Sequence, residues 1–134
     1  MATEFELSVA GNTKNLLDSI AVLADQKINL TTVATARVDD RYVVKFITGD
    51  DEEVRRTFMK ADISFKERPV LVVNVHNRPG EWVKVARCLV NGGVEINASY
   101  LLSQNGATMR FVFVVDNHVK AKDIAKQIAE CSVD

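Results

Sequence analysis

The chain has 134 residues, of which 47% are hydrophobic and 26% are charged, and its formal net charge is -1. This composition is that of an ordinary globular protein, so a disordered chain is excluded. The basic residues are scattered, with Arg55 and Arg56 the only adjacent pair, so nucleic acid is not an expected partner. No secretory leader or long apolar segment is visible, and we therefore expect a reduced, cytoplasmic protein with no membrane partner.

Two halves of the sequence follow the same pattern at a shift of about 66 residues. Residues 5–10 align with residues 71–76, and residues 16–30 align with residues 82–96. The match is one of hydrophobic pattern rather than of identity. We therefore expect two domains, residues 1–68 and 69–134, each small enough to need an interface for stability.

The first half predicts a strand, a helix, a hairpin, a helix and a strand. Apolar and polar residues alternate in the strands, and apolar residues recur at helical spacing in the helices. Asp50 or Asp51 is expected to cap the second helix, and Pro69 to end the last strand. The predicted elements are a strand at 5–10, a helix at 16–24, a hairpin of 28–38 and 41–48, a helix at 52–60 and a strand at 61–67.

The second half predicts the same order. Gly92 and Gly93 end its first helix, since glycine tolerates the left-handed conformation there. Asn105 and Gly106 predict a tight hairpin turn, and Asp116 or Asn117 is expected to cap the last helix. The predicted elements are a strand at 70–75, a helix at 82–90, a hairpin of 94–103 and 108–115 and a helix at 119–130, which leaves residues 131–134.

These elements predict an α+β fold of two tandem ferredoxin-like βαββαβ units, each an antiparallel sheet with its helices on one face. The second unit is expected to lack a full last strand, because only four residues follow its last helix. A missing strand would expose backbone donors and acceptors along a sheet edge. We therefore expect another element to cover that edge, either from the first repeat or from a second chain.

Catalytic motifs are missing from the sequence. It contains no P-loop, no G-x-G-x-x-G and no G-x-S-x-G. His76 and His118 lie beside neither a cysteine nor paired acids, and Cys88 falls on an apolar helical stripe. The acidic clusters lie where a turn and a helix start favour acids, and the phenylalanines are better explained as core than as a base-stacking surface. We therefore predict no catalytic residue, no metal and no cofactor.

The loop at residues 76–81 is the best candidate site. Pro79 suits the first turn of a helix, and Gly80 lets a ligand or another backbone come close. The free N–H groups of the first turn and the helix dipole favour an anion such as a carboxylate. Asn77 offers both a donor and an acceptor. The same residues are also compatible with a purely structural turn.

The predicted βαββαβ order of strands and helices along the chain resembles that of the ACT domain. Three motifs support the resemblance: Asn-Arg-Pro-Gly-Glu at 77–81, Gly-Gly-Val-Glu-Ile-Asn-Ala at 92–98, and Asn-Gly at 105–106. It covers both halves, although the first has Gly-Asn-Thr-Lys at 11–14 in place of Asn-Arg-Pro-Gly. The second half is most similar to the serine-sensing domain of phosphoglycerate dehydrogenases.

The resemblance implies where a ligand binds. In the ACT family, domains pair side by side, and an amino acid binds between the first loop of one domain and the second strand of its neighbour. Gly11 and Asn12 are the counterpart in the first repeat. Glu95 departs from the asparagine that serine-sensing relatives tend to have, so serine itself is not predicted. The implied ligand-binding residues are Asn77, Arg78, Pro79, Gly80, Glu81, Glu95, Ile96 and Asn97.

The resemblance also implies a function. The expected protein is an allosteric regulator without a catalytic domain, which binds an amino acid, forms a homodimer and acts on a separate metabolic enzyme. One alternative is a regulatory interaction subunit of a biosynthetic enzyme with no ligand of its own. A second alternative is a small enzyme that uses His76 beside Asn77.

Overall fold

The computed structural model describes residues 2–134, which divide into two compact units. One unit is Thr3–Arg68, and the other consists of Ala2 and Pro69–Asp134. The first half of the chain forms β1 (Thr3–Ala10), α1 (Thr13–Asp25), β2 (Leu30–Val38), β3 (Arg41–Thr48), α2 (Asp51–Lys60) and β4 (Lys66–Pro69). The second half forms β5 (Leu71–His76), α3 (Glu81–Asn91), β6 (Ile96–Gln104), β7 (Thr108–Val115), α4 (His118–Lys126) and β8 (Ser132–Val133).

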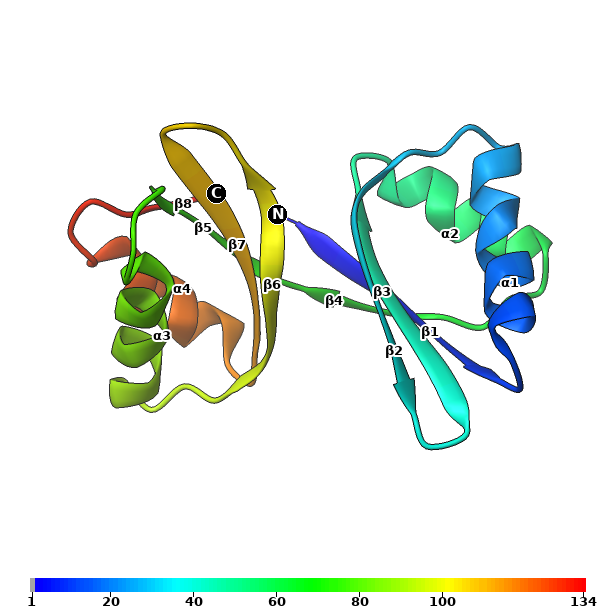
Figure 1. Ribbon diagram of the computed structural model, residues 1–134, viewed down its shortest axis with the longest axis horizontal. Helices are drawn as coiled ribbons and strands as arrows, with labels where there is room; N and C mark the ends of the chain where they lie inside the picture. The colour runs from blue at the N-terminus through cyan, green and yellow to red at the C-terminus, as the bar shows by residue number, and fades with distance from the viewer. Residues whose placement is uncertain (1) are drawn as a thin grey trace. The chain divides into compact units, whose positions relative to one another are not determined.

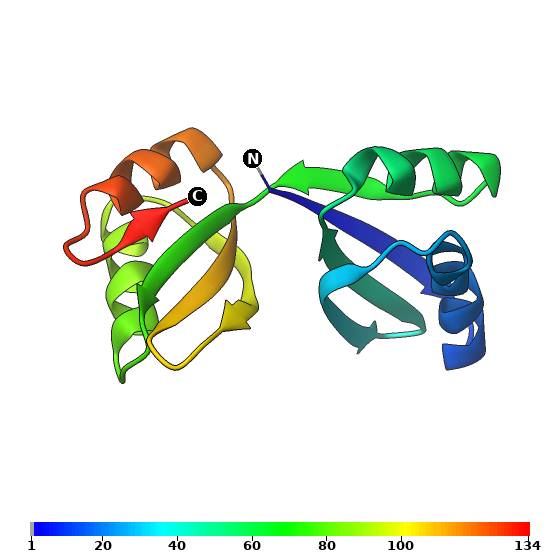
Figure 2. The same ribbon diagram turned by 90° about the horizontal axis from the view of Figure 1, so that it is seen from above.

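Each half builds a four-stranded antiparallel sheet. The strand orders are β2-β3-β1-β4 and β6-β7-β5-β8, so the two halves share one topology. In each unit both helices lie on one face of the sheet (Figures 1 and 2). The predicted fold, two tandem βαββαβ units, is confirmed, as is the shortened last strand of the second unit.

The first unit buries an aromatic core between its sheet and its helices. The Phe5 and Phe46 rings stack with centroids 5.5 Å apart, and Phe58 of α2 meets Phe46 edge-on at 6.1 Å. All three side chains are fully buried. Removing one such ring costs about 3–5 kcal/mol. The remaining buried apolar residues of this core are Leu7, Leu16, Leu23, Ile28, Val44 and Val54.

The second unit has a largely aliphatic core. Alternate residues of β5 face it, as Leu71, Val73 and Val75 do. On α4 the buried positions are Ala121 and Ala125, and these small side chains let that helix lie close to the sheet. The remaining buried apolar residues of this core are Val85, Ala86, Leu89, Val94 and Phe113.

Two predicted boundaries were wrong. The strand expected at 61–67 is β4, which begins only at Lys66, and Ile63 and Phe65 pack against the core without belonging to a strand. The last helix ends at Lys126, not at residue 130. Residues 127–130 form a turn that lets the chain run back along β5, with Glu130 at a φ of 60°.

The exposed edge of β5 is covered differently from the prediction. From the sequence, the covering element was expected to come from the first repeat or from a second chain. Instead, β8 pairs antiparallel with β5, and the Asp134 N–H donates to the Val72 carbonyl at 3.1 Å. At the start of β5, the Val70 N–H donates to the carbonyl of Ala2 at 3.1 Å, and Ala2 belongs to the same compact unit.

Three helices end in the same hydrogen-bonded motif but with different residues at its left-handed position. After α3 this residue is Gly93 at a φ of 86°, whereas after α1 it is Lys27 at 60° and after α2 it is Asp62 at 56°. In α1 the Ile28 and Lys27 N–H groups donate to the carbonyls of Leu23 and Ala24, both at 2.9 Å.

Within residues 2–134 no helix has the length and apolar character of a membrane span.

Lys27→Gly is expected to stabilise the first unit. The left-handed region costs a residue with a Cβ roughly 1–2 kcal/mol, and glycine gives back about 0.4–1 kcal/mol through its more flexible unfolded chain. The net gain should be on the order of 0.5–1 kcal/mol, measured by urea unfolding. Lys27→Ala removes the same charge without relieving the strain. An equal gain in both variants would show that charge, rather than backbone conformation, is responsible.

Candidate functional site

The candidate loop joins β5 to α3 and is fastened to the adjacent hairpin by Asn77. Its backbone N–H donates to the Ala107 carbonyl at 2.9 Å, and its Nδ2 donates to the Asn105 carbonyl at 3.0 Å. Asn105 Oδ1 in turn accepts hydrogen bonds from the backbone N–H groups of Ala107 and Thr108, both at 2.8 Å. Part of the Asn77 amide therefore holds the loop, which leaves less of it for a ligand than the sequence suggested.

Glu81, the first residue of α3, is a buried carboxylate with only 3% of its surface exposed. Arg78 Nε donates a hydrogen bond to Glu81 Oε1, and Lys84 Nζ lies 2.8 Å from Glu81 Oε2. Lys84 and Arg78 hold the pKa of Glu81 below its ordinary value, against the effect of burial. An acid at a helix start is also favoured by the helix dipole. The buried charge is thus compensated within the loop and first turn.

Arg78 has a second carboxylate partner, Glu130, in the turn before β8. Its hydrogen bonds to Glu81 and Glu130 raise the pKa of the guanidinium further above its ordinary value. The family resemblance implies a ligand-binding role for Arg78, but in the structure its guanidinium is paired with two carboxylates of the protein. The spacing from Glu81 to Lys84 is visible in the sequence as a helical ion pair. Glu130, 52 residues from Arg78, carries no such local signal.

Gly80 occupies the N-cap position of α3 with a φ of 86°, which explains the need for glycine. Pro79 therefore lies just before the cap, not inside the first turn as the sequence suggested. Gly80 has no side chain to accept from the first N–H groups of the helix, and α3 has no side-chain cap. A Cβ built on Gly80 meets nothing within 4 Å. The start of α3 therefore has no side-chain cap and has open space beside Gly80.

The corresponding loop of the first repeat, before α1, is filled by side chains. Asn12 caps α1, because its Oδ1 accepts from the Asn15 N–H at 3.0 Å. Gly11, at a φ of 102°, lies against the Asn15 side chain, whose Nδ2 would be 2.5 Å from an added Cβ. The same loop position is therefore filled in one repeat and open in the other.

Glu95, Ile96 and Asn97 lie at the opposite end of the same sheet from the loop. Ile96 pairs with Val115, whereas His76, which precedes the loop, pairs with Thr108 at the other end of β7. The Glu95 N–H is held by the Asp116 carboxylate at 3.0 Å, and the Ile96 side chain packs against the core. The Glu95 and Asn97 side chains are exposed. Within one domain, the two predicted halves of the site are not brought together.

Trp82, assigned from sequence only to the buried helix stripe, also links α3 to β6. Its Nε1 donates to Ser99 Oγ at 2.9 Å, and Ser99 Oγ donates to the Val112 carbonyl at 2.8 Å. The indole stacks on Phe113 with ring centroids 6.1 Å apart, yet 39% of the residue remains exposed. The first turn of α3 is therefore held rigidly beside the edge strand.

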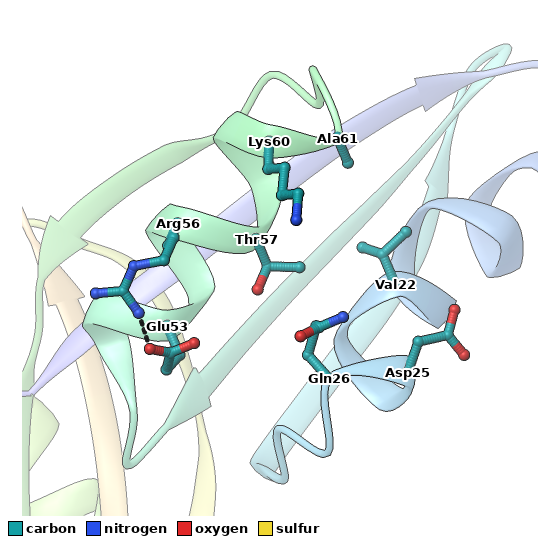
Figure 3. A pocket seen from close by; sticks show the side chains of 8 residues that line it. All are labelled: Val22, Asp25, Gln26, Glu53, Arg56, Thr57, Lys60 and Ala61. Carbon is teal, nitrogen blue, oxygen red and sulfur yellow. Dashed lines mark ion pairs between the residues drawn. The ribbon is translucent and has the colours of Figure 1, made fainter.

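Hollows occur beside the loop and in the first unit. A cavity of about 380 Å³ next to the loop is bounded by His76 and Thr108 on one side and Glu130 and Ser132 on the other. A second, of about 290 Å³, lies between α1 and α2 (Figure 3). Among residues 2–134, no three His, Cys, Asp or Glu side chains gather as a metal site would require.

Solved structures share this fold across nearly the whole chain. Protein BT0572 from Bacteroides thetaiotaomicron superposes with a TM-score of 0.88 at 21% identity, covering 99% of this chain and 91% of that one. The regulatory subunit of aspartate kinase from Thermus thermophilus superposes at 0.65 with 13% identity, covering 94% and 91%. The chain therefore shares its tandem fold with these two structures. The resemblance to the serine-sensing domain is not shown by these structures and stays a prediction.

Other comparisons set the limits of this likeness. The regulatory subunit of aspartate kinase from Thermus flavus superposes on this chain with a TM-score of 0.60 at 12% identity, covering 84% of this chain and 81% of that one. No family model matches the sequence, and no curated protein sequence matches it. At these identities the structures establish the fold alone.

Acid pH should loosen the loop at residues 77–81 by protonating Glu81 and breaking its ion pairs with Arg78 and Lys84. Because the folded-state pKa of Glu81 lies below 4.5, its two ion pairs contribute fully above pH 4.5 and are lost as the pH falls through that lowered value. We expect the Glu81 carboxyl carbon to titrate below pH 4.5 in NMR spectra, with faster amide exchange at residues 77–81 in the same range. Glu81→Gln should abolish that transition. A carboxyl that titrates at or above 4.5 would contradict the assigned ion pairs.

Proposed function

We propose that this protein is a regulatory ACT-like protein that binds a small molecule, an amino acid, at the open first turn of α3. The observation that carries the proposal is the uncapped N-terminus of α3 at Gly80, which faces free space while the matching position of the first repeat is filled. The alignment over almost the full length of an aspartate kinase regulatory subunit supports a regulatory role.

The chemistry of the open turn suits a carboxylate. Unpaired N–H groups and the positive end of the helix dipole attract an anion. Arg78 supplies no free cation, because its guanidinium is bound to Glu81 and Glu130, so backbone donors carry the recognition. The ammonium group of an amino acid needs an acceptor from elsewhere. The exposed carboxylate of Glu95, from a neighbouring domain, has the right charge.

Calorimetry against each of the twenty amino acids tests the proposal. At least one should bind, and Gly80→Asp should weaken that binding by 10-fold or more (about 1.4 kcal/mol), because its carboxylate repels the ligand's. Gly80→Asn places an uncharged side chain at the same N-cap position, as Asn12 does in the first repeat, so the loss of affinity beyond that of Gly80→Asn measures the effect of the aspartate charge. Gly49→Asp adds the same charge at an open position of the first unit. No heat with any amino acid would rule out the sensor.

The second candidate is an interaction subunit with no ligand, acting on a separate biosynthetic enzyme. The ion pairs of Arg78 with Glu81 and Glu130 favour it, since they already balance the positive charge of the loop. Silent calorimetry together with co-purification of a catalytic partner would support this function. Binding without that partner would support the first.

A second copy of the chain is the neighbour we propose for the open turn. β6 is an edge strand whose far end, Gln104, pairs with Met109, level with the loop that follows His76. Antiparallel pairing of β6 with β6 of another copy would therefore bring that copy's residues 95–97 to the loop. Beside this edge, α3 exposes Val83 (46%) and Val90 (56%), apolar area that a dimer would cover.

Val83→Glu and Val90→Glu should each shift a dimer toward monomer. A charge placed in an apolar contact, repeated by symmetry, should weaken association by 10-fold or more, which sedimentation equilibrium measures. Val119→Glu, on α4 and 72% exposed, is the matched control and should leave the dimer intact. A wild-type chain that is monomeric at every concentration would exclude this interface.

A further inference from the structure

The cavity of the first unit lies between the end of α1 and the outer face of α2. It has a volume of about 290 Å³, close to the lower limit of known small-ligand pockets. In Figure 3, Lys60 and Thr57 of α2 project into the gap from one side, and Gln26 and Asp25 come from the end of α1 on the other. The full lining is Val22, Asp25, Gln26, Glu53, Arg56, Thr57, Lys60 and Ala61.

Two opposite charges across this cavity have no partner among the residues that the structure describes. Glu53 and Arg56 neutralise each other within α2. Asp25 and Lys60 form no ion pair and no side-chain hydrogen bond with any of residues 2–134. The cavity therefore presents a free carboxylate on one helix and a free ammonium group on the other.

The position of Asp25 makes its side of the cavity strongly negative. Asp25 is the last residue of α1, where the helix dipole is negative, and the last turn of α1 contains no basic residue. The end of α2, in contrast, carries Lys60, which compensates its own helix dipole. A cation is thus favoured beside Asp25, while Lys60 supplies the one positive charge that an anion would need on the other side. The Thr57 hydroxyl and the Gln26 amide add hydrogen-bonding groups between them.

We propose that this cavity is a second ligand site, for a small zwitterion with one ammonium and one carboxylate group. The ammonium group binds Asp25, and the carboxylate binds Lys60 and the Thr57 hydroxyl. The apolar part of the ligand lies against Val22 and Ala61. This site is separate from the α3 loop and gives the first repeat a binding surface of its own, although its regulatory consequence rests on the function proposed for the whole protein.

NMR titration of the full-length chain, labelled with ¹⁵N, separates the two sites. The probes are the twenty amino acids, with acetate and methylamine as ligands that each lack one charged group. We expect at least one amino acid to cause saturable shifts at the amides of Val22, Thr57 and Ala61, and acetate and methylamine at equal concentration to bind at least 10-fold more weakly. Shifts confined to residues 77–82 would overturn this proposal and leave the α3 site standing. Shifts confined to the cavity would support this proposal and argue against binding at the α3 loop.

Two variants test the assigned contacts. Asp25→Asn and Lys60→Gln should each weaken binding at the cavity by 5-fold or more while leaving any shifts at residues 77–82 unchanged. Asp40→Asn, in the exposed turn between β2 and β3, is the control for a lost carboxylate and should bind as the wild type does. Unchanged affinity in both Asp25→Asn and Lys60→Gln, or equal binding of acetate, would overturn the zwitterion assignment.

Discussion

Burial of one sheet face beneath two helices is the constraint on which the rest of this protein depends. Each half of the chain has only two short helices with which to cover four strands. The first half fills the space between sheet and helices with packed phenylalanines. The second half fills it with aliphatic side chains, and two alanines let α4 lie close to the sheet. Since the core takes the apolar face of every helix, recognition is left to helix ends, connecting loops and strand edges.

The buried carboxylate of Glu81 links the core to the candidate site. A charge with so little exposure must be paired, and Arg78 and Lys84 pair it. Arg78 extends the network to Glu130, beside the short strand β8. The loop is consequently held on one side by charge and on the other by the bonds of Asn77 to the hairpin. This rigidity leaves the donors of the first turn, rather than flexible side chains, as the binding groups.

The two repeats have diverged at equivalent positions. At the loop between the first strand and the first helix, Asn12 caps α1 with its side chain, whereas Gly80 leaves the start of α3 without a side-chain cap. At the end of the first helix, Lys27 takes the strained conformation that Gly93 takes freely. The cavity with unpaired Asp25 and Lys60 lies in the repeat whose loop is closed. The divergence thus separates the candidate sites, one at the open loop of the second repeat and one between the helices of the first.

The sequence by itself determined the repeat, the order of strands and helices along the chain, the shortened last strand and the glycines that end α3, because hydrophobic period and turn chemistry are local. It misplaced the start of β4 and the end of α4, where packing and the return of the chain along β5 decide the boundary. Only the tertiary structure showed that Arg78 is bound to Glu130, that Asn77 holds a hairpin, and that residues 95–97 lie at the far end of the sheet from the loop. Each of these joins residues distant in sequence, and no local pattern specifies such a pairing.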